Sequence, residues 1–278
     1  MVLALGKTAA SLLLAADLTQ RVRRPVSTPA WTVGSGAARY ASVLREMYGD
    51  ASFRPTPWLS GLLGGHLQTI WYGLDQPPEF GFSDERWQTA DGGTLGLAWA
   101  DAPSLPDHAP IVLILPGLCG SVDGTGYSVR AMLDAGMRPA VFHSRGCGVG
   151  LTSPNFNLFG DTDDLRAAIA RIAEQRPGAP VCLYSISAGT ALMVRYLGEE
   201  GEGAPITAAV ANCPGYDIGV CMQRVAWLYN GGYYMGVLKR HWLTGENGDV
   251  LRAASPELFA KMEAAPDMHS SWLKALSY

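Results

Sequence analysis

Long apolar stretches, an excess of one charge and paired cysteine motifs are all scarce in this 278-residue sequence. The 21 basic and 25 acidic residues nearly cancel to a net charge of −4, and the basic ones are scattered apart from a short RVRR cluster. Nucleic acid is therefore not an expected partner. Because charged residues make up 17% and hydrophobic ones 48% of the chain, we expect a globular protein and not a disordered one.

The cysteines are odd in number and form no C-x-x-C pair, which argues against a disulfide framework or a zinc site. We expect all five to be reduced thiols that fill space in the core. They are Cys119, Cys147, Cys182, Cys213 and Cys221. No cluster of ligand residues predicts a metal site, and the chemistry expected below needs no organic cofactor.

The N-terminal segment, residues 1–25, carries the only stretch that approaches a membrane span. It is mostly apolar from Val2 to Leu18 but is interrupted by Lys7 and Asp17, and a spanning helix needs about 20 apolar residues. Three interpretations stay open: a weak membrane anchor, a targeting peptide or an ordinary amphipathic helix. We expect membrane association, with an organelle or the cytoplasm as the alternatives.

The rest of the chain divides into three segments. Residues 26–85 are rich in Pro, Gly and Trp and form the first part of the main domain. Residues 86–215 alternate strand-like and helix-like runs, which predicts a mostly parallel sheet with helices on both faces, an α/β fold. The expected elements are a hairpin around Asp91, buried strands at 110–117, 138–146 and 180–187, a fourth strand at 206–215, and helices at 126–136, 161–178 and 188–201.

After Tyr216 the alternation stops, and residues 216–278 read as helices rich in aromatic residues. Such a segment is expected to form a helical lid over the sheet. The aromatic stretch at 227–242 would offer its apolar face to an acyl chain, or would pack as core without touching a ligand.

Ser187 lies at the junction of a buried strand and a helix, in the sequence Ser-Ile-Ser-Ala-Gly at 185–189. In open α/β sheets, sites form at the carboxyl ends of strands. A sharp strand-to-helix turn there exposes a serine hydroxyl as a nucleophile, in the pattern G-x-S-x-G. Ser185 replaces the first glycine but is still small. The alternative is an N-cap serine on an ordinary turn.

A glycine-rich loop, LPGLCGS at 115–121, directly follows the first buried strand. A loop in that position supplies one donor of an oxyanion hole, and the residue after the nucleophile supplies the other. We assign the two backbone N–H groups to Leu118 and Ala188. The alternative is that the glycines only allow a tight turn.

Five ordered motifs, GGHLQTIW, LPGLCGS, HSRGCG, SISAG and RYLGEEG, together resemble the α/β-hydrolase-domain family. This family contains membrane-anchored carboxylesterases, acylglycerol lipases and phospholipases, and bacterial esterase relatives. The resemblance runs from about Pro55 to Gly215. It implies an α/β-hydrolase fold, Ser187 as nucleophile, and hydrolysis of carboxylic esters, lipid or acylglycerol esters in particular.

Three departures from the family pattern stand out. Pro116 replaces the histidine that is usual in the oxyanion loop, and Ser185 replaces glycine. The family's acid and histidine follow two further strands, which the sequence after Cys213 does not show. His66 and His143 lie in family motifs without matching the catalytic base, so we expect His66 to be structural and His143 to end a strand.

Three hypotheses account for the missing partners of Ser187. The chain is truncated before the last strands; or Asp217 and His241 complete a triad in the chain order serine, acid, histidine, with His269 as a weaker alternative; or the protein is a non-catalytic binding relative. Without a base, only about 10³–10⁴-fold of acceleration over water would remain. The base therefore decides between an enzyme and a nearly inert chain.

Overall fold

The structure is a computed structural model that describes residues 42, 43, 46, 74, 76–102, 104–217, 219–221 and 232–268. The chain divides into two compact units, residues 1–76 and 77–278, and the second contains the sheet and its helices. The expectations for residues 1–25, for most of 26–85 including His66, for the lid stretch 222–231 and for His269 lie outside the described residues.

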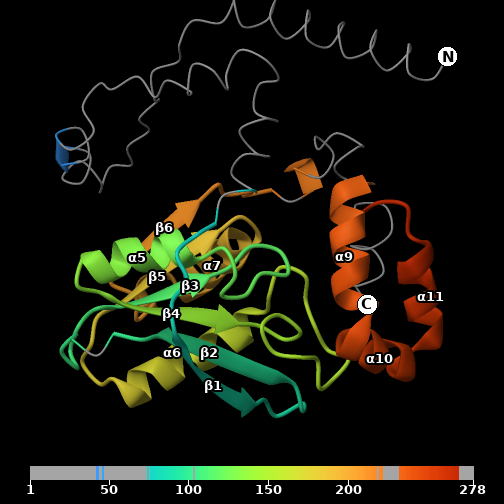
Figure 1. Ribbon diagram of the computed structural model, residues 1–278, viewed down its shortest axis with the longest axis horizontal. Coiled ribbons are helices and arrows are strands. Elements are labelled where there is room, and N and C mark those ends of the chain that lie inside the picture. The colour runs from blue at the N-terminus through green and yellow to red at the C-terminus, as the bar shows by residue number, and fades with distance from the viewer. Residues whose placement is uncertain are drawn as a thin grey trace, which may run out of the picture. The chain divides into compact units, whose positions relative to one another are not determined.

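The sheet has six strands in the order β1-β2-β4-β3-β5-β6 (Figure 1). Its first two strands, β1 (Phe82–Gln88) and β2 (Thr94–Ala100), pair antiparallel around the predicted turn. The turn is closed by the Thr89 N–H, which donates to the Gly93 carbonyl at 2.8 Å. β2 then pairs antiparallel with β4 and joins the hairpin to the parallel part of the sheet.

The parallel part alternates strands and helices as predicted. Its elements are β3 (Ile111–Leu115), α5 (Gly126–Asp134), β4 (Arg138–His143), α6 (Thr162–Gln175), β5 (Val181–Ile186), α7 (Ala188–Glu200) and β6 (Ala208–Asn212). Every residue of β3 and β4 is buried, because helices cover both faces of a parallel sheet. The α/β prediction is confirmed.

Two apolar clusters form the core on the two faces of the sheet. On one face Leu113 and Leu183 pack with Leu165 of α6 and Leu192 of α7, and on the other Ile114 and Val141 pack with Val129 of α5.

Local sequence explains why α6 starts where it does. The Asp161 side chain accepts the Asp163 N–H at 2.9 Å, and two further acidic residues favour the positive helix N-terminus.

The edge strand β6 differs from the others because most of its residues are exposed. Cys213, which directly follows it, is exposed as well, and only Cys147 is fully buried. The expectation of five core thiols is therefore wrong for Cys213. Its physical reason is position: a residue at the end of an edge strand has the sheet on one side only.

After β6 the longer described helices are α9 (Met235–Trp242), α10 (Gly245–Ala254) and α11 (Pro256–Ala264). They stand as one group beside the sheet (Figure 1). Their apolar faces share a cluster with Cys147, Leu151 and Leu158, which come from the loops after β4. These helices thus pack on loops at the carboxyl ends of the strands, and their role as a lid stays a prediction. None of the described helices has the length and apolar character needed to cross a membrane.

A candidate active site at the turn between β5 and α7

Ser187 occupies a sharp turn between β5 and α7. Its backbone has φ 50° and ψ −113°, a conformation that costs a residue with a side chain of the order of 1–3 kcal/mol. Neighbouring groups hold it: the Ser187 N–H donates to the Asn212 carbonyl at 3.0 Å, and the Ser187 carbonyl accepts the Thr190 N–H at 3.0 Å. Strain held in this way is typical of a turn that presents a nucleophile.

The two small residues that flank the turn have separate physical reasons. Ser185 is fully buried, and its hydroxyl donates to the Val210 carbonyl at 3.3 Å. Serine in place of glycine is therefore accommodated and hydrogen-bonded. Gly189 has no such freedom, because a Cβ atom there would lie 2.4 Å from the Leu115 carbonyl oxygen.

The loop after β3 folds into a tight turn against Ser187. The Gly120 N–H donates to the Gly117 carbonyl at 3.0 Å, and Cys119, the third residue of the turn, has φ 56°. A positive φ at that position is characteristic of a type II turn, whose second residue keeps its N–H outside the turn's own hydrogen bond. That second residue is Leu118.

Ala188 is the first residue of α7, so its N–H has no carbonyl partner within the helix. Leu118 and Ala188 both line the cavity into which Ser187 opens. The structure thus brings the three predicted site residues together. Two of them carry N–H groups that local geometry leaves available.

The cavity at Ser187 has a volume of about 230 Å³. The other side chains that line it are Phe159, Cys213, Pro214, Cys221, Tyr234 and Met268. Among the described residues of its wall, none is a histidine, an aspartate or a glutamate. Within the described ranges, no group of three metal-ligating side chains is present either.

His241 and Asp217, the two in-chain candidates for the triad, do not lie on this wall. The His241 Nε2 atom is 2.7 Å from the Gly146 carbonyl oxygen, so Nε2 carries a proton and donates it. Burial lowers the pKa of His241. Asp217 accepts the Val220 N–H at 2.9 Å through Oδ1. The described contacts therefore connect neither residue to Ser187.

His143 ends β4, as expected for a strand-end residue. It is 3% exposed, its Nε2 atom has no hydrogen-bond partner, and burial lowers the pKa of its imidazole.

Two residues further on, Arg145 forms a bidentate pair with Asp164, at 2.8 Å for both bonds, and contacts Asp91 at 2.5 Å. This cation joins the hairpin turn, the loop after β4 and α6.

Sequence reasoning missed Phe159 and Met268 as parts of the site, whereas Tyr234 lies in the aromatic stretch 227–242 that was expected to face an acyl chain. Phe159 comes from the loop between β4 and α6, and the other two from the helical region. An aromatic residue in a loop gives no periodic signal. The only local sign was the Asn157–Gly160 turn signal just before α6, which marks an ordered loop without saying what it faces.

The comparisons with known proteins agree with this architecture. The family model described as serine aminopeptidase, S33 matches residues 106–272, which is more than half of the chain. The chain belongs to this family. The match spans the region from β3 to α11 and includes the loop after β3 and the β5–α7 turn that carries Ser187.

Three relatives show the range of proteins to which this chain is similar. Human protein ABHD15 is 32% identical over 171 residues, which are 58% of this chain and 36% of the relative. Mouse phospholipase ABHD3 is 28% identical over 180 residues, 62% of this chain and 43% of the relative. The monoacylglycerol lipase of Saccharomyces cerevisiae is 27% identical over 143 residues, which are 49% of this chain and 29% of the relative. The matched segments span less than half of each relative.

Proposed function

We propose that this protein is a serine esterase that hydrolyses carboxylic esters, lipid or acylglycerol esters in particular. The observation that carries the proposal is the position of Ser187, on a strained turn that opens into a cavity lined also by Leu118 and Ala188. The Ser187 hydroxyl attacks the ester carbonyl, the alcohol leaves, and water releases the acid from the acyl-enzyme.

The oxyanion that forms during attack needs two donors aimed at one oxygen. In the proposal these are the backbone N–H groups of Leu118 and Ala188. The type II turn frees the first and the start of α7 frees the second. Removing one such donor in a hydrolase costs about 10²–10³-fold in kcat, so the geometry of this turn is central to the rate.

The character of the cavity supports an acyl chain over a peptide N-terminus as the bound group. An aminopeptidase must pair the charged amino group of its substrate, which calls for a carboxylate. The described wall offers apolar and sulfur-containing side chains instead, among them Phe159, Pro214 and Met268. The names of two relatives, a phospholipase and a monoacylglycerol lipase, point the same way. Membrane association through residues 1–25 would bring such a site to lipid substrates.

The proton of the Ser187 hydroxyl must pass to a general base. Reaction with a fluorophosphonate tests for that base, because only an activated serine reacts rapidly. We expect the 278-residue chain to be labelled and Ser187→Ala to stay unlabelled, with thermal melts showing that both are folded. A folded wild-type chain without labelling would refute esterase activity of these 278 residues and favour a non-catalytic binding protein on the same fold. A wild-type chain that does not fold would favour the truncation hypothesis.

A further inference from the structure

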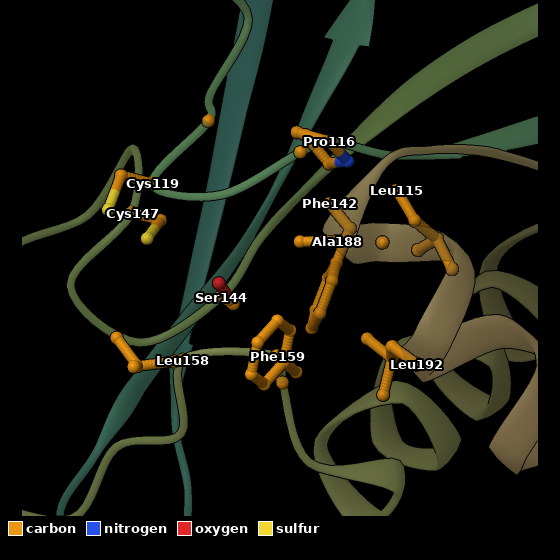
Figure 2. Close-up of a pocket in the computed structure, with 14 residues that line it drawn as sticks. Leu115, Pro116, Cys119, Phe142, Ser144, Cys147, Leu158, Phe159, Ala188 and Leu192 are labelled. Atoms are coloured by element: carbon orange, nitrogen blue, oxygen red, sulfur yellow. The ribbon is translucent and has the colours of Figure 1, made fainter. Parts of the chain in front are cut away.

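A second, smaller cavity lies next to the cavity at Ser187. Its volume is about 30 Å³, and its wall includes Leu158, Phe142 and Leu192 (Figure 2). The two cavities have two lining residues in common, Phe159 and Ala188. Ala188 belongs to the start of α7 and carries one of the proposed oxyanion donors. Phe159 is therefore the one side chain of the shared wall that can be shortened.

The backbone around Phe159 is held in place by neighbouring groups. The Asn157 side chain accepts the Phe159 N–H at 2.9 Å, and the Asn157 carbonyl accepts the Gly160 N–H at 3.1 Å. Gly160 has φ 86°, and a Cβ atom there would lie 2.7 Å from the Leu192 side chain. The loop is thus closely packed on α7. The phenyl ring, in Figure 2 between Leu158 and Leu192, has a fixed attachment point.

We propose that Phe159 is the specificity-determining residue that sets the length of the acyl chain, by closing the Ser187 cavity off from the smaller cavity behind it. The inference rests on the proposed esterase function. An acyl chain that starts at Ser187 extends along the apolar wall until it meets the phenyl ring. The smaller cavity has space for little more than one water molecule. It becomes useful to a chain only when the ring is removed.

The chemistry of the smaller cavity fits an extension of the acyl site. Leu115, Phe142, Leu158 and Leu192 form the apolar part of its wall, while Ser144 and several glycines form the polar part. Further methylene groups placed there would leave water for an apolar surface, and each is worth about 10-fold or more in discrimination by an enzyme pocket. Phe159→Ala should therefore move the preference toward longer chains instead of lowering the activity evenly.

The test compares wild type, Phe159→Ala and Leu158→Ala on p-nitrophenyl esters from acetate to dodecanoate, with Ser187→Ala as the blank. Leu158 is buried and lines only the smaller cavity, so its truncation enlarges that cavity but keeps the separating ring. We expect kcat/KM for the long esters, relative to acetate, to rise by about 10-fold or more in Phe159→Ala. Leu158→Ala should keep the wild-type order of preference.

A second measurement, calorimetric binding of 1-alkanols from butanol to dodecanol, does not depend on catalysis. Here too, Phe159→Ala should gain affinity for the longer alcohols and Leu158→Ala should not. An unchanged chain-length order in a folded Phe159→Ala protein would overturn the role of Phe159, as would an equal shift in Leu158→Ala. If no variant shows hydrolysis that depends on Ser187, the esterase proposal fails, and alkanol binding alone decides the role of Phe159.

Discussion

The start of α7 touches the end of β3 at Gly189 and Leu115: a side chain at Gly189 would place its Cβ atom 2.4 Å from the Leu115 carbonyl oxygen. The Pro116 carbonyl oxygen lies at 2.5 Å from the same point. Both are backbone atoms, which cannot rotate away. The glycine after the serine turn is therefore fixed by the contact between helix α7 and the end of strand β3.

Gly189→Ala should consequently be strongly unfavourable. We expect a loss of about 3 kcal/mol in the free energy of unfolding, toward the upper end for overpacked sites, and a displaced Ser187. Urea unfolding measures the loss of stability, and fluorophosphonate labelling measures the effect on Ser187. Gly198→Ala is the matched control, because it lies in the same helix with no atom within 4 Å. It should stabilise the protein by about 0.5–1 kcal/mol. Equal effects of the two changes would contradict this explanation.

Arg145 is expected to be a structural residue that holds the loop after β4. Its partner Asp164 has a side chain only 7% exposed, so Arg145→Ala leaves a buried carboxylate unpaired. The expected loss is about 3–5 kcal/mol in the free energy of unfolding, measured by urea denaturation. Arg195→Ala, which removes an exposed pair with Glu199 on α7, should cost only a small fraction of that. Similar losses for both would show that Asp164 finds another partner.

Stability should depend on pH through His143. Burial lowers the pKa of this imidazole below its ordinary value of 6.5 in spite of the nearby Asp84 and Asp123 carboxylates, while Arg86 lowers it further. As the pH falls below about 6.5, this histidine takes up a proton in the unfolded chain before it does so in the folded chain. Unfolding therefore becomes easier as the pH falls. Above about pH 6.5 the folded protein keeps its full stability. Below it, this one histidine lowers the free energy of unfolding by at most about 1.4 kcal/mol per pH unit.

His143→Phe keeps a ring in the same place and removes the titration. We expect its unfolding free energy to change less with pH between about pH 7.5 and 5.5 than that of the wild type. Part of the slope should persist, because burial also lowers the pKa of His241. Urea titrations at several pH values measure the slope. An unchanged slope in His143→Phe would show that this histidine is protonated equally in both states.

His241→Gln tests the triad hypothesis for Asp217 and His241. The His241 Nε2–H donates to the Gly146 carbonyl, which also accepts the Asn247 amide N–H at 3.0 Å. A glutamine amide can replace that donor without being a base. If Ser187 of the wild type is labelled, we expect His241→Gln to be labelled at a similar rate. Loss of labelling in a folded His241→Gln protein would instead assign the base to His241.

Most of the sheet could be predicted from the sequence because its signals are local. Uninterrupted apolar runs marked β3, β4 and β5, and the Asp-Gly-Gly turn marked the hairpin of β1 and β2. The exposure of β6 could not be predicted, since its composition resembles that of a buried strand. Whether a strand lies at the edge depends on the order of strands in the sheet, and Cys213 was misjudged for that reason.

The sequence by itself determined the α/β fold, the serine at the β5–α7 turn and the small residues that this turn needs, since each follows from periodicity or from the chemistry of one tight turn. Only the tertiary structure decided what surrounds Ser187. The wall of its cavity comes from the loop after β3, the loop before α6, the segment after the edge strand β6 and the helical region. Residues so distant along the chain are brought together by packing, and no local pattern encodes which of them meet.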